Sequence, residues 1–310
     1  DRSPSRGLGD VYKRQLVLAL AVTVIELALI LSMVLAGGED KLTLPRDTIF
    51  STIMIIGNGV VGICVLAGGL RHRELSFRIE GANSGLAALV TLSTLTLVLP
   101  TFTTSAPGPR YTPSQLGFAA IASLLIWIVF VFVQTVRHRD YFLPPGSAGD
   151  EAAHLPPPSA GRAWASFALL VVSLVAVVGL AKMLSPTIET LVVKAGAPRS
   201  VIGIAIAMLV LMPETWAAVR AALANRLQTS LNLALGSALA SIGLTIPGVA
   251  AVAIWLHLPL VLGVDAKDLV LLLLTFIVGA ITLASGRTHI MQGAIHLVIF
   301  AAFLFLALVP

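Results

Sequence analysis

The chain alternates between long apolar runs and short polar stretches. Nine of the runs contain about 20 mostly apolar residues, the length that a helix needs to cross the hydrocarbon core of a bilayer. These runs cover residues 16–36, 47–70, 84–102, 114–136, 164–184, 200–222, 229–256, 266–284 and 290–309. The pattern therefore predicts an all-α polytopic membrane protein with nine transmembrane helices.

The composition supports this fold class. Hydrophobic residues make up 57% of the chain and charged residues 11%, whereas soluble domains carry about 25% charged residues. Such a chain cannot cover itself with polar surface in water, so we expect the lipid bilayer as its solvent. The single cysteine, Cys64, excludes a disulfide framework or a multi-cysteine metal site.

Two polar segments divide the chain. Residues 1–15 are polar, lack an initiator Met and resemble sequencing-adapter sequence, so we expect a non-native or disordered tail. Residues 137–163 contain RHRD, three consecutive prolines at 156–158 and several Gly and Ser, which indicates a flexible linker. We expect this linker to separate a first membrane repeat, 16–136, from a second, 164–310.

The basic residues indicate orientation. One side of the predicted membrane collects Arg71, Arg73, Arg78, Arg137, Arg139, Arg162, Arg220, Arg226 and Arg287. The other collects Lys41, Arg46, Arg110, Lys182, Lys194, Arg199 and Lys267. Because cytoplasmic loops carry the excess of Lys and Arg, this small bias places the linker in the cytoplasm. The basic residues are scattered rather than clustered, so we expect no nucleic-acid partner.

Two acidic residues, Glu26 and Glu214, lie deep within apolar runs, and no Lys or Arg lies at comparable depth. A charge at the bilayer centre costs about 2.5–3.5 kcal/mol on insertion scales, so each carboxyl is either protonated and packed or bound to a cation. Thr23 lies one turn before Glu26, and Pro213 directly precedes Glu214. A proline frees a backbone carbonyl one turn back, and hard cations prefer such oxygen ligands.

The run after each Glu run is also polar at depth. Asn58 lies between two glycines, and residues 229–256 contain Asn232, Ser237 and Ser241. These residues are candidate cation ligands beside the two carboxyls, although small residues also serve close helix packing. By the charge bias, the two pairs of runs enter the membrane from opposite faces, which is the arrangement of inverted-topology repeats with a midplane substrate site.

Four stretches together resemble the ChaA-type calcium/proton antiporters of the cation/calcium exchanger superfamily. They are ALAVTVIELALILSMVLAGGE (19–39), EGANSGLAALVTLSTLTLVLPTFTTS (80–105), FVQTVRHRDYFLP (132–144) and NLALGSALASIGLTIPG (232–248). The resemblance implies ten core helices in two inverted repeats of five, with the first helix missing from this chain. It also implies a bacterial inner-membrane location.

The resemblance implies cation/proton exchange without a cofactor, and it assigns the ion-binding acids to Glu26 and Glu214. Ca²⁺, Na⁺ and K⁺ remain open as cargo, because Thr23 and Leu211 stand where many relatives carry Asn. Burial and mutual repulsion favour the protonated form of two such carboxyls, so protons would compete with the cation as the site alternates between the membrane faces.

Three alternatives to an antiporter follow from the residues: a passive cation channel, an intramembrane hydrolase or a purely structural subunit. A hydrolase needs a nucleophile and a base at depth, and a metalloprotease needs HExxH, which is absent. His257, His289 and His296 are expected near helix ends, packing at the interface. His138 is expected at the cytoplasmic surface. The oligomeric state stays open.

Overall fold

The computed structural model describes residues 23–35, 42–144, 160–194 and 200–309, together with Gly196 and Pro198. The predicted tail, 1–15, and the central part of the linker, 145–159, lie outside the described residues. The place where a missing first core helix would join the chain also lies outside them.

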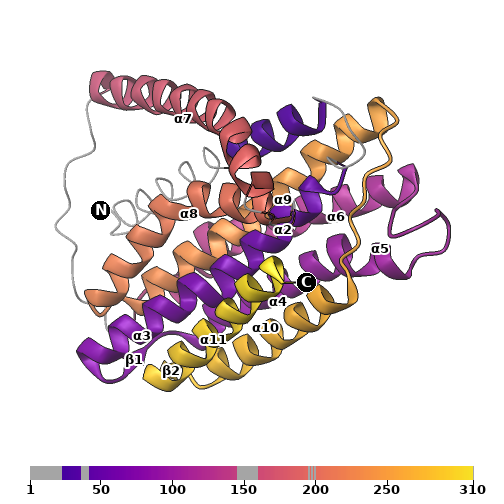
Figure 1. The fold of residues 1–310 in the computed structure, drawn as a ribbon. Helices are drawn as coiled ribbons and strands as arrows, with labels where there is room; N and C mark the ends of the chain where they lie inside the picture. The colour runs from indigo at the N-terminus through magenta and orange to yellow at the C-terminus, as the bar shows by residue number, and fades with distance from the viewer. Residues whose placement is uncertain are drawn as a thin grey trace.

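The described chain is a helical bundle with one very small sheet (Figure 1). A helix over Thr23–Leu35, called here the Glu26 helix, comes first. The elements that follow are α2 (Leu44–Met54), η2 (Ile55–Val60), α3 (Val61–His72), β1 (Leu75–Ser76), α4 (Ile79–Ser93), η3 (Thr94–Val98), α5 (Leu99–Phe102), α6 (Pro113–Phe132), η4 (Val133–Arg137), η5 (Arg139–Phe142), α7 (Ala160–Lys194), α8 (Ser200–Leu223), α9 (Leu227–Trp255), α10 (Ala266–Ala284), β2 (Arg287–Thr288) and α11 (Ile290–Leu308).

Each of the nine predicted runs coincides with helical residues, and the protein is an integral membrane protein. Seven helices among the described residues are long and apolar enough to cross a bilayer. The other two runs correspond to the Glu26 helix and to α7. The residues of η2, η3 and η4 are π-helical turns that the apolar pattern did not predict.

Helix α7 extends beyond the fifth predicted run at both ends. Helix α7 spans 35 residues and continues through Pro186, well beyond the predicted end at residue 184. Within the predicted linker, η5 covers Arg139–Phe142 and α7 begins at Ala160. A proline removes one backbone hydrogen bond, and a membrane helix tolerates that loss where local adjustments satisfy the freed group.

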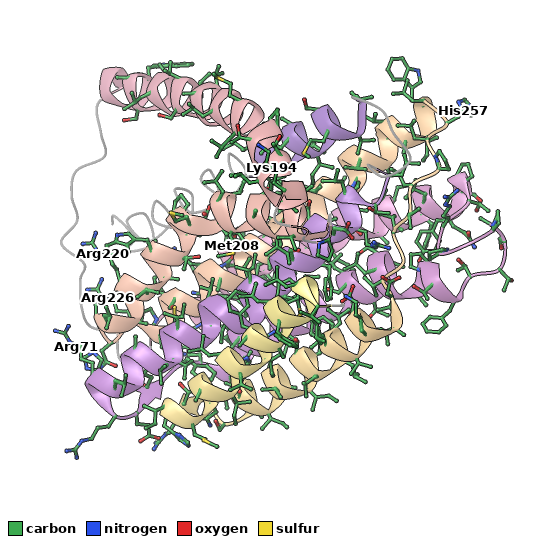
Figure 2. All side chains as sticks on the ribbon, in the orientation of Figure 1. Arg71, Lys194, Met208, Arg220, Arg226 and His257 are labelled. Carbon is green, nitrogen blue, oxygen red and sulfur yellow. The ribbon has the colours of Figure 1, made fainter. Side chains whose placement is uncertain are left out.

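The two ends of the bundle differ in charge (Figure 2). At the end called here the arginine end, α3, α6 and α8 finish, and α4, α9 and α11 begin. The antiparallel pair of β1 and β2 lies there, and His72 Nε2 donates to the Leu223 carbonyl over 2.9 Å. The described basic residues at this end are Arg71, Arg73, Arg78, Arg137, Arg139, Arg220, Arg226 and Arg287.

The opposite end, called here the aspartate end, holds the starts of α2, α8 and α10 and the end of α9. Arg46 on α2 donates to the Gly263 carbonyl over 3.2 Å. Asp47, Asp265 and Asp268 interact electrostatically at this end. Its described basic residues are Arg46, Arg110, Lys194 and Lys267. The excess of basic charge therefore lies at the arginine end.

The Glu26 helix and α8 run in opposite directions. Helix α8 runs from the aspartate end to the arginine end. Leu42, seven residues after Leu35, accepts a hydrogen bond from Val261 at the aspartate end. Seven residues span at most about 25 Å, less than the roughly 44 Å length of the 29-residue α9. Glu26 bonds to Ser241 halfway along α9, so Leu35 lies within that reach of the aspartate end only if the Glu26 helix points toward it.

Helix α9 lies at the centre of the bundle, in contact with α2, α3, α4, α6 and α8 (Figure 1). Close packing depends on small residues. A Cβ at Gly243 of α9 would lie 2.6 Å from Trp127, and a Cβ at Gly248 would lie 2.6 Å from Leu27 of the Glu26 helix. This packing brings the Glu26 helix against the middle of α9.

Candidate cation site

Glu26 is held by a hydrogen bond from the second half of the chain. Its side chain is 4% exposed, and the Ser241 hydroxyl donates to Oε2 over 2.5 Å. Ser241 lies halfway along α9, so this carboxyl sits near the middle of the bundle. The bond explains why a serine is kept at depth in an apolar helix, because a buried polar group without a partner costs free energy.

Glu214 lies on α8, which continues without interruption through Pro213. Its side chain is 6% exposed. The Glu26 carboxyl interacts electrostatically with Glu214. Neither carboxylate oxygen of Glu214 has a hydrogen-bond partner among the described residues. The two lone acids predicted from the sequence thus lie within electrostatic range of one another, buried inside the bundle.

Several buried oxygens around the two acids have no hydrogen-bond partner. Glu26 Oε1 is one of them, together with both carboxylate oxygens of Glu214. Thr52 on α2 faces the Glu26 carboxyl in a weak side-chain hydrogen bond, whose geometry falls outside the standard limits. Nearly all buried polar groups in proteins are paired, so these unpaired oxygens are available to a proton, a water molecule or a cation. Hard cations bind to oxygen atoms of this kind.

Two stripes of hydroxyl groups accompany the acids. Thr48 lies one turn before Thr52 on α2, and its buried hydroxyl also lacks a partner. On α9, Ser237 and Thr245 flank Ser241 by one turn on either side, and all three side chains are buried. Sequence analysis missed Thr48, Thr52 and Thr245. Their spacing of four residues was the available signal.

Thr23 and Ser237 are two further ligands predicted from the sequence. Thr23 is buried, one turn before Glu26 on the same helix. Ser237 is 8% exposed on the face of α9 that carries Ser241. By their spacing, Thr23 shares a helix face with Glu26, and Ser237 shares a helix face with Ser241, which bonds to Glu26.

Asn58 and Asn232 are not brought to the carboxyls. Asn58 Nδ2 donates to Thr275 Oγ1 over 2.8 Å on α10, and Asn58 Oδ1 lies 3.2 Å from His296 Nδ1 on α11. Asn232 Nδ2 donates to the Phe142 carbonyl over 2.6 Å near the arginine end. The expectation that each asparagine pairs with a preceding Glu was wrong, because other helices supply closer partners.

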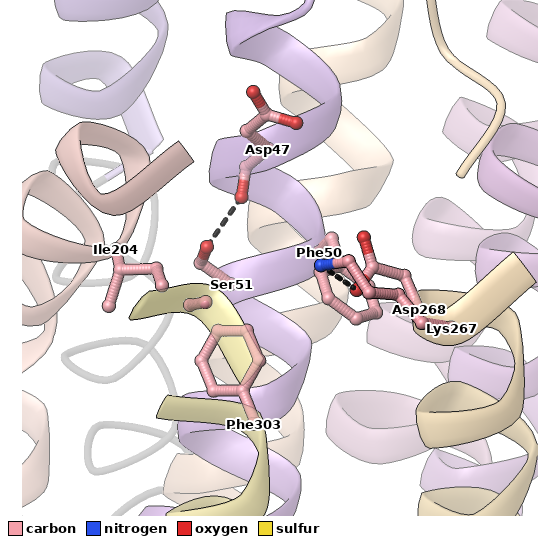
Figure 3. Close-up of a pocket in the computed structure, with 8 residues that line it drawn as sticks. Asp47, Phe50, Ser51, Ile204, Lys267, Asp268 and Phe303 are labelled. Carbon is pink, nitrogen blue, oxygen red and sulfur yellow. Dashed lines mark hydrogen bonds and ion pairs between the residues drawn. The ribbon is translucent and has the colours of Figure 1, made fainter. Parts of the chain in front are cut away.

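A small cavity opens at the aspartate end of α2 (Figure 3). Its volume is about 30 Å³, and it is lined by Asp47, Phe50, Ser51, Ile204, Lys267, Asp268, Phe303 and Ala307. The charges in it are paired: Arg46 Nε contacts Asp47 Oδ1 at 2.8 Å, and Lys267 Nζ contacts Asp268 Oδ1 at 3.5 Å. The cavity is lined in part by α2, the helix that carries Thr48 and Thr52, and it lies toward the membrane surface.

The described side chains limit which atoms could coordinate a cation at Glu26 and Glu214. Among the described residues, no three His, Cys, Asp or Glu side chains gather into a metal cluster. A cation at Glu26 and Glu214 would therefore be completed by hydroxyl or carbonyl oxygens. Oxygen ligands of these kinds suit hard cations.

Comparison with known proteins identifies the family. The family model described as sodium/calcium exchanger protein matches residues 15–136 and 165–309, which is most of the chain. These two matched segments coincide with the two predicted membrane repeats on either side of the linker.

Three curated relatives are similar over most of the chain. The candidate ionic transporter y4hA of Sinorhizobium fredii is 48% identical over 95% of this chain and 80% of its own length. The sodium-potassium/proton antiporter ChaA of Escherichia coli is 33% identical over 96% of this chain and 80% of its own. The Ca²⁺/H⁺ antiporter of Aphanothece halophytica is 25% identical over 81% of this chain and 71% of its own.

Solved structures share the fold. The structure of YfkE matches with a TM-score of 0.71 and 16% identity, covering 99% of this chain and 89% of that one. The H⁺/Ca²⁺ exchanger CAX matches with a TM-score of 0.65 and 16% identity, covering 97% and 74%. With the buried acid pair and the matched family model, these likenesses lead to one conclusion: the chain belongs to the sodium/calcium exchanger protein family.

Proposed function

We propose that this protein exchanges inorganic cations for protons by alternating access, with Glu26 and Glu214 as the shared binding site of both. The observation that carries the proposal is the buried group of carboxylate oxygens without hydrogen-bond partners: Glu26 Oε1, Glu214 Oε1 and Glu214 Oε2. Bare carboxylates at this depth are costly, so each is stabilised by a proton or by a cation. Competition between the two for the same oxygens couples their movement.

Ser241, Ser237, Thr52 and Thr23 complete the proposed ligand set through hydroxyl oxygens. Ser241 orients Glu26 in the state described here. When a cation binds, the Ser241 hydroxyl turns its lone pairs to the ion, because a hydroxyl is both donor and acceptor. A divalent ion neutralises both carboxylates and a monovalent ion neutralises one, so Ca²⁺, Na⁺ and K⁺ are all candidate cargo.

The names of the relatives support proton coupling. ChaA of Escherichia coli is named a sodium-potassium/proton antiporter, and the Aphanothece halophytica relative a Ca²⁺/H⁺ antiporter. Both couple a cation to a proton, although they differ in cation. We therefore propose antiport with protons for this protein, and not exchange of one metal cation for another.

We further propose two inverted repeats, 16–136 and 164–310, joined by a cytoplasmic linker in a bacterial inner membrane. The opposite directions of the Glu26 helix and α8 support this arrangement. The excess of arginine at the end where the linker begins supports a cytoplasmic location for that end.

Proteoliposomes with a pH-sensitive dye in the lumen test this function. Ca²⁺, Na⁺ or K⁺ is added outside while the membrane potential is clamped, and liposomes without protein serve as the control. An antiporter makes the lumen more alkaline with at least one cation, because each cation that enters expels protons. Cation uptake without any change in luminal pH would indicate a passive channel and would contradict the proposal.

A further inference from the structure

His296 is buried at a place where sequence analysis expected an interfacial residue. That expectation was wrong: the side chain is 1% exposed, on the second turn of α11 and packed against η2 and α3. No part of the proposed cation chemistry uses it. A buried imidazole in a membrane protein is costly without partners, so its contacts indicate what it does.

His296 is the centre of a chain of hydrogen bonds across three helices. Its Nδ1 lies 3.2 Å from Asn58 Oδ1 on η2, and its Nε2 lies 3.1 Å from Thr282 Oγ1 on α10. Asn58 Nδ2 continues the chain to Thr275 Oγ1 over 2.8 Å, and Thr275 donates to the Leu271 carbonyl over 2.7 Å. All four side chains are buried.

The direction of this chain follows from its acceptors. The amide oxygen of Asn58 can only accept, so His296 Nδ1 carries the proton and donates it. Nε2 of the neutral imidazole then accepts from the Thr282 hydroxyl. The Asn58 side-chain amide therefore accepts a hydrogen bond from α11 through its oxygen and donates one to α10 through its nitrogen. Both polar atoms of the amide are held in place. A fully satisfied network of this kind specifies one arrangement of the helices that it joins.

Asn58 belongs to a π-helical turn in the helix that carries Thr52. The turn η2 interrupts the span Leu44–His72 between α2 and α3. An extra residue in a turn rotates the helix beyond it by about 100°, the angle that one residue spans in an α-helix. The position of the turn therefore decides which face of α2 points at Glu26 while α3 keeps its own packing.

The surroundings of η2 leave little freedom to shift. A Cβ at Gly59 would lie 3.3 Å from Phe300 of α11, and a Cβ at Gly62 would lie 3.0 Å from Leu297. On the α10 side, a Cβ at Gly57 would lie 3.2 Å from Thr275. Helices α10 and α11 thus press directly on the backbone of the π-turn, and the bond between His296 and Asn58 lies within that contact.

The cavity beside the network argues against a second cation site there. It has a volume of about 30 Å³ and is lined by Gly57, Thr275, Thr282, His296 and otherwise apolar side chains. No carboxylate lines it among the described residues, so a bound cation would be uncompensated. The network is therefore structural in its contacts, and its effect reaches the transport site through η2.

We propose that His296 is a positioning residue for the cation site: through Asn58 it holds the π-turn η2 and thereby keeps Thr52 facing Glu26. This inference rests on the proposed function only for its effect on transport. Its effect on the position of η2 does not depend on the identity of the cargo.

Three variants test the inference. Comparing them separates the loss of the bond to Asn58 from a general loss of stability. His296→Leu removes the donor to Asn58, whereas His296→Asn keeps an amide donor at the position of Nδ1. Thr282→Val removes the other hydrogen bond of the imidazole and leaves the bond to Asn58. All three lose part of one buried network, but only His296→Leu releases η2.

Two quantities are measured in proteoliposomes: the cation concentration that gives half-maximal exchange, and the maximal exchange rate. His296→Leu is expected to raise that concentration about tenfold, the equivalent of one hydrogen bond of about 1.4 kcal/mol. His296→Asn and Thr282→Val are expected to stay within about threefold of the unchanged protein, since the bond to Asn58 remains. If His296→Leu does not insert, Asn58→Ser removes the same bond, together with the bond from Asn58 to Thr275.

Hydrogen exchange of the amides in Ile55–Val60 gives a second readout that needs no transport. Exchange in this segment should rise in His296→Leu and stay unchanged in Thr282→Val. Equal exchange in both variants, or unchanged cation affinity in His296→Leu and Asn58→Ser, would overturn the inference. Absence of exchange activity in the unchanged protein would instead reject the proposed function, while the amide measurement would still decide the role of His296.

Discussion

The Ser241 hydroxyl donates a 2.5 Å hydrogen bond to Glu26 Oε2, joining residues 215 positions apart. One residue comes from each side of the linker. This bond ties the first acid-bearing helix to the central helix α9 at half its length. This contact places Glu26 beside the buried hydroxyl groups of α9, in the other half of the chain.

Ser241→Ala is expected to weaken cation binding without abolishing exchange. The substitution removes both the bond that orients Glu26 and one proposed oxygen ligand. A hydrogen bond to a charged group contributes about 1.5–3 kcal/mol, so the half-saturating cation concentration should rise at least about tenfold. Cation-dependent pH change in proteoliposomes, measured over a range of concentrations, checks this.

Ser93→Ala serves as the matched control for that variant. Ser93 is also fully buried, but it donates to the Leu89 carbonyl of its own helix over 2.7 Å. The Ser93→Ala variant should lose little stability and keep the cation affinity of the unchanged protein. A Ser241→Ala protein with unchanged affinity would show that this serine only fills space beside Glu26.

Asn232→Ala is expected to lower stability while leaving cation affinity unchanged. Asn232 donates to the Phe142 carbonyl and accepts from Gln228 Nε2 over 2.9 Å, far along α9 from Ser241. Leaving such buried partners unpaired costs about 1–3 kcal/mol. Thermal unfolding in detergent, with the exposed Asn83→Ala as control, measures the loss. A large fall in affinity at unchanged stability would return Asn232 to the cation site.

Gly293→Ala tests the packing of α11 on α3. A Cβ there would lie 2.5 Å from the Leu66 backbone nitrogen, so the two helices must move apart. Overpacking of this kind costs about 1–3 kcal/mol and should lower the melting temperature. Gly117→Ala on α6 is the control, since its Cβ would first meet Ile254 at 3.9 Å. Equal melting temperatures for both variants would mean that α11 packs less closely than described.

Much of the fold could be predicted from the apolar pattern alone. Each predicted run is helical over the residues that the structure describes, because about 20 apolar residues must satisfy their backbone hydrogen bonds internally in lipid. The buried positions of Glu26 and Glu214 could also be predicted, since each lies deep within an apolar run. The position of a residue within an apolar run gives its depth in the bilayer, so features that depend on depth alone could be predicted from the sequence.

The partners of polar side chains could not be predicted, because they depend on how helices distant in sequence pack. Asn58 was expected to pair with Glu26, but it bonds to Thr275 and His296 from two helices near the end of the chain. The π-turn at η2 has no periodic signal of its own. Thr52 was overlooked because a threonine in an apolar run has no cost that requires an explanation.

The most direct test of the central claim is proton-coupled cation transport by Glu26→Gln and Glu214→Gln, each reconstituted beside the unchanged protein. Glutamine keeps the size of the side chain but can neither release a proton nor neutralise a cation. We expect both variants to insert and to keep the melting temperature of the unchanged protein, yet to show no cation-dependent change in luminal pH. Retained exchange in both variants would contradict the claim that these two carboxyls carry the cation and the proton.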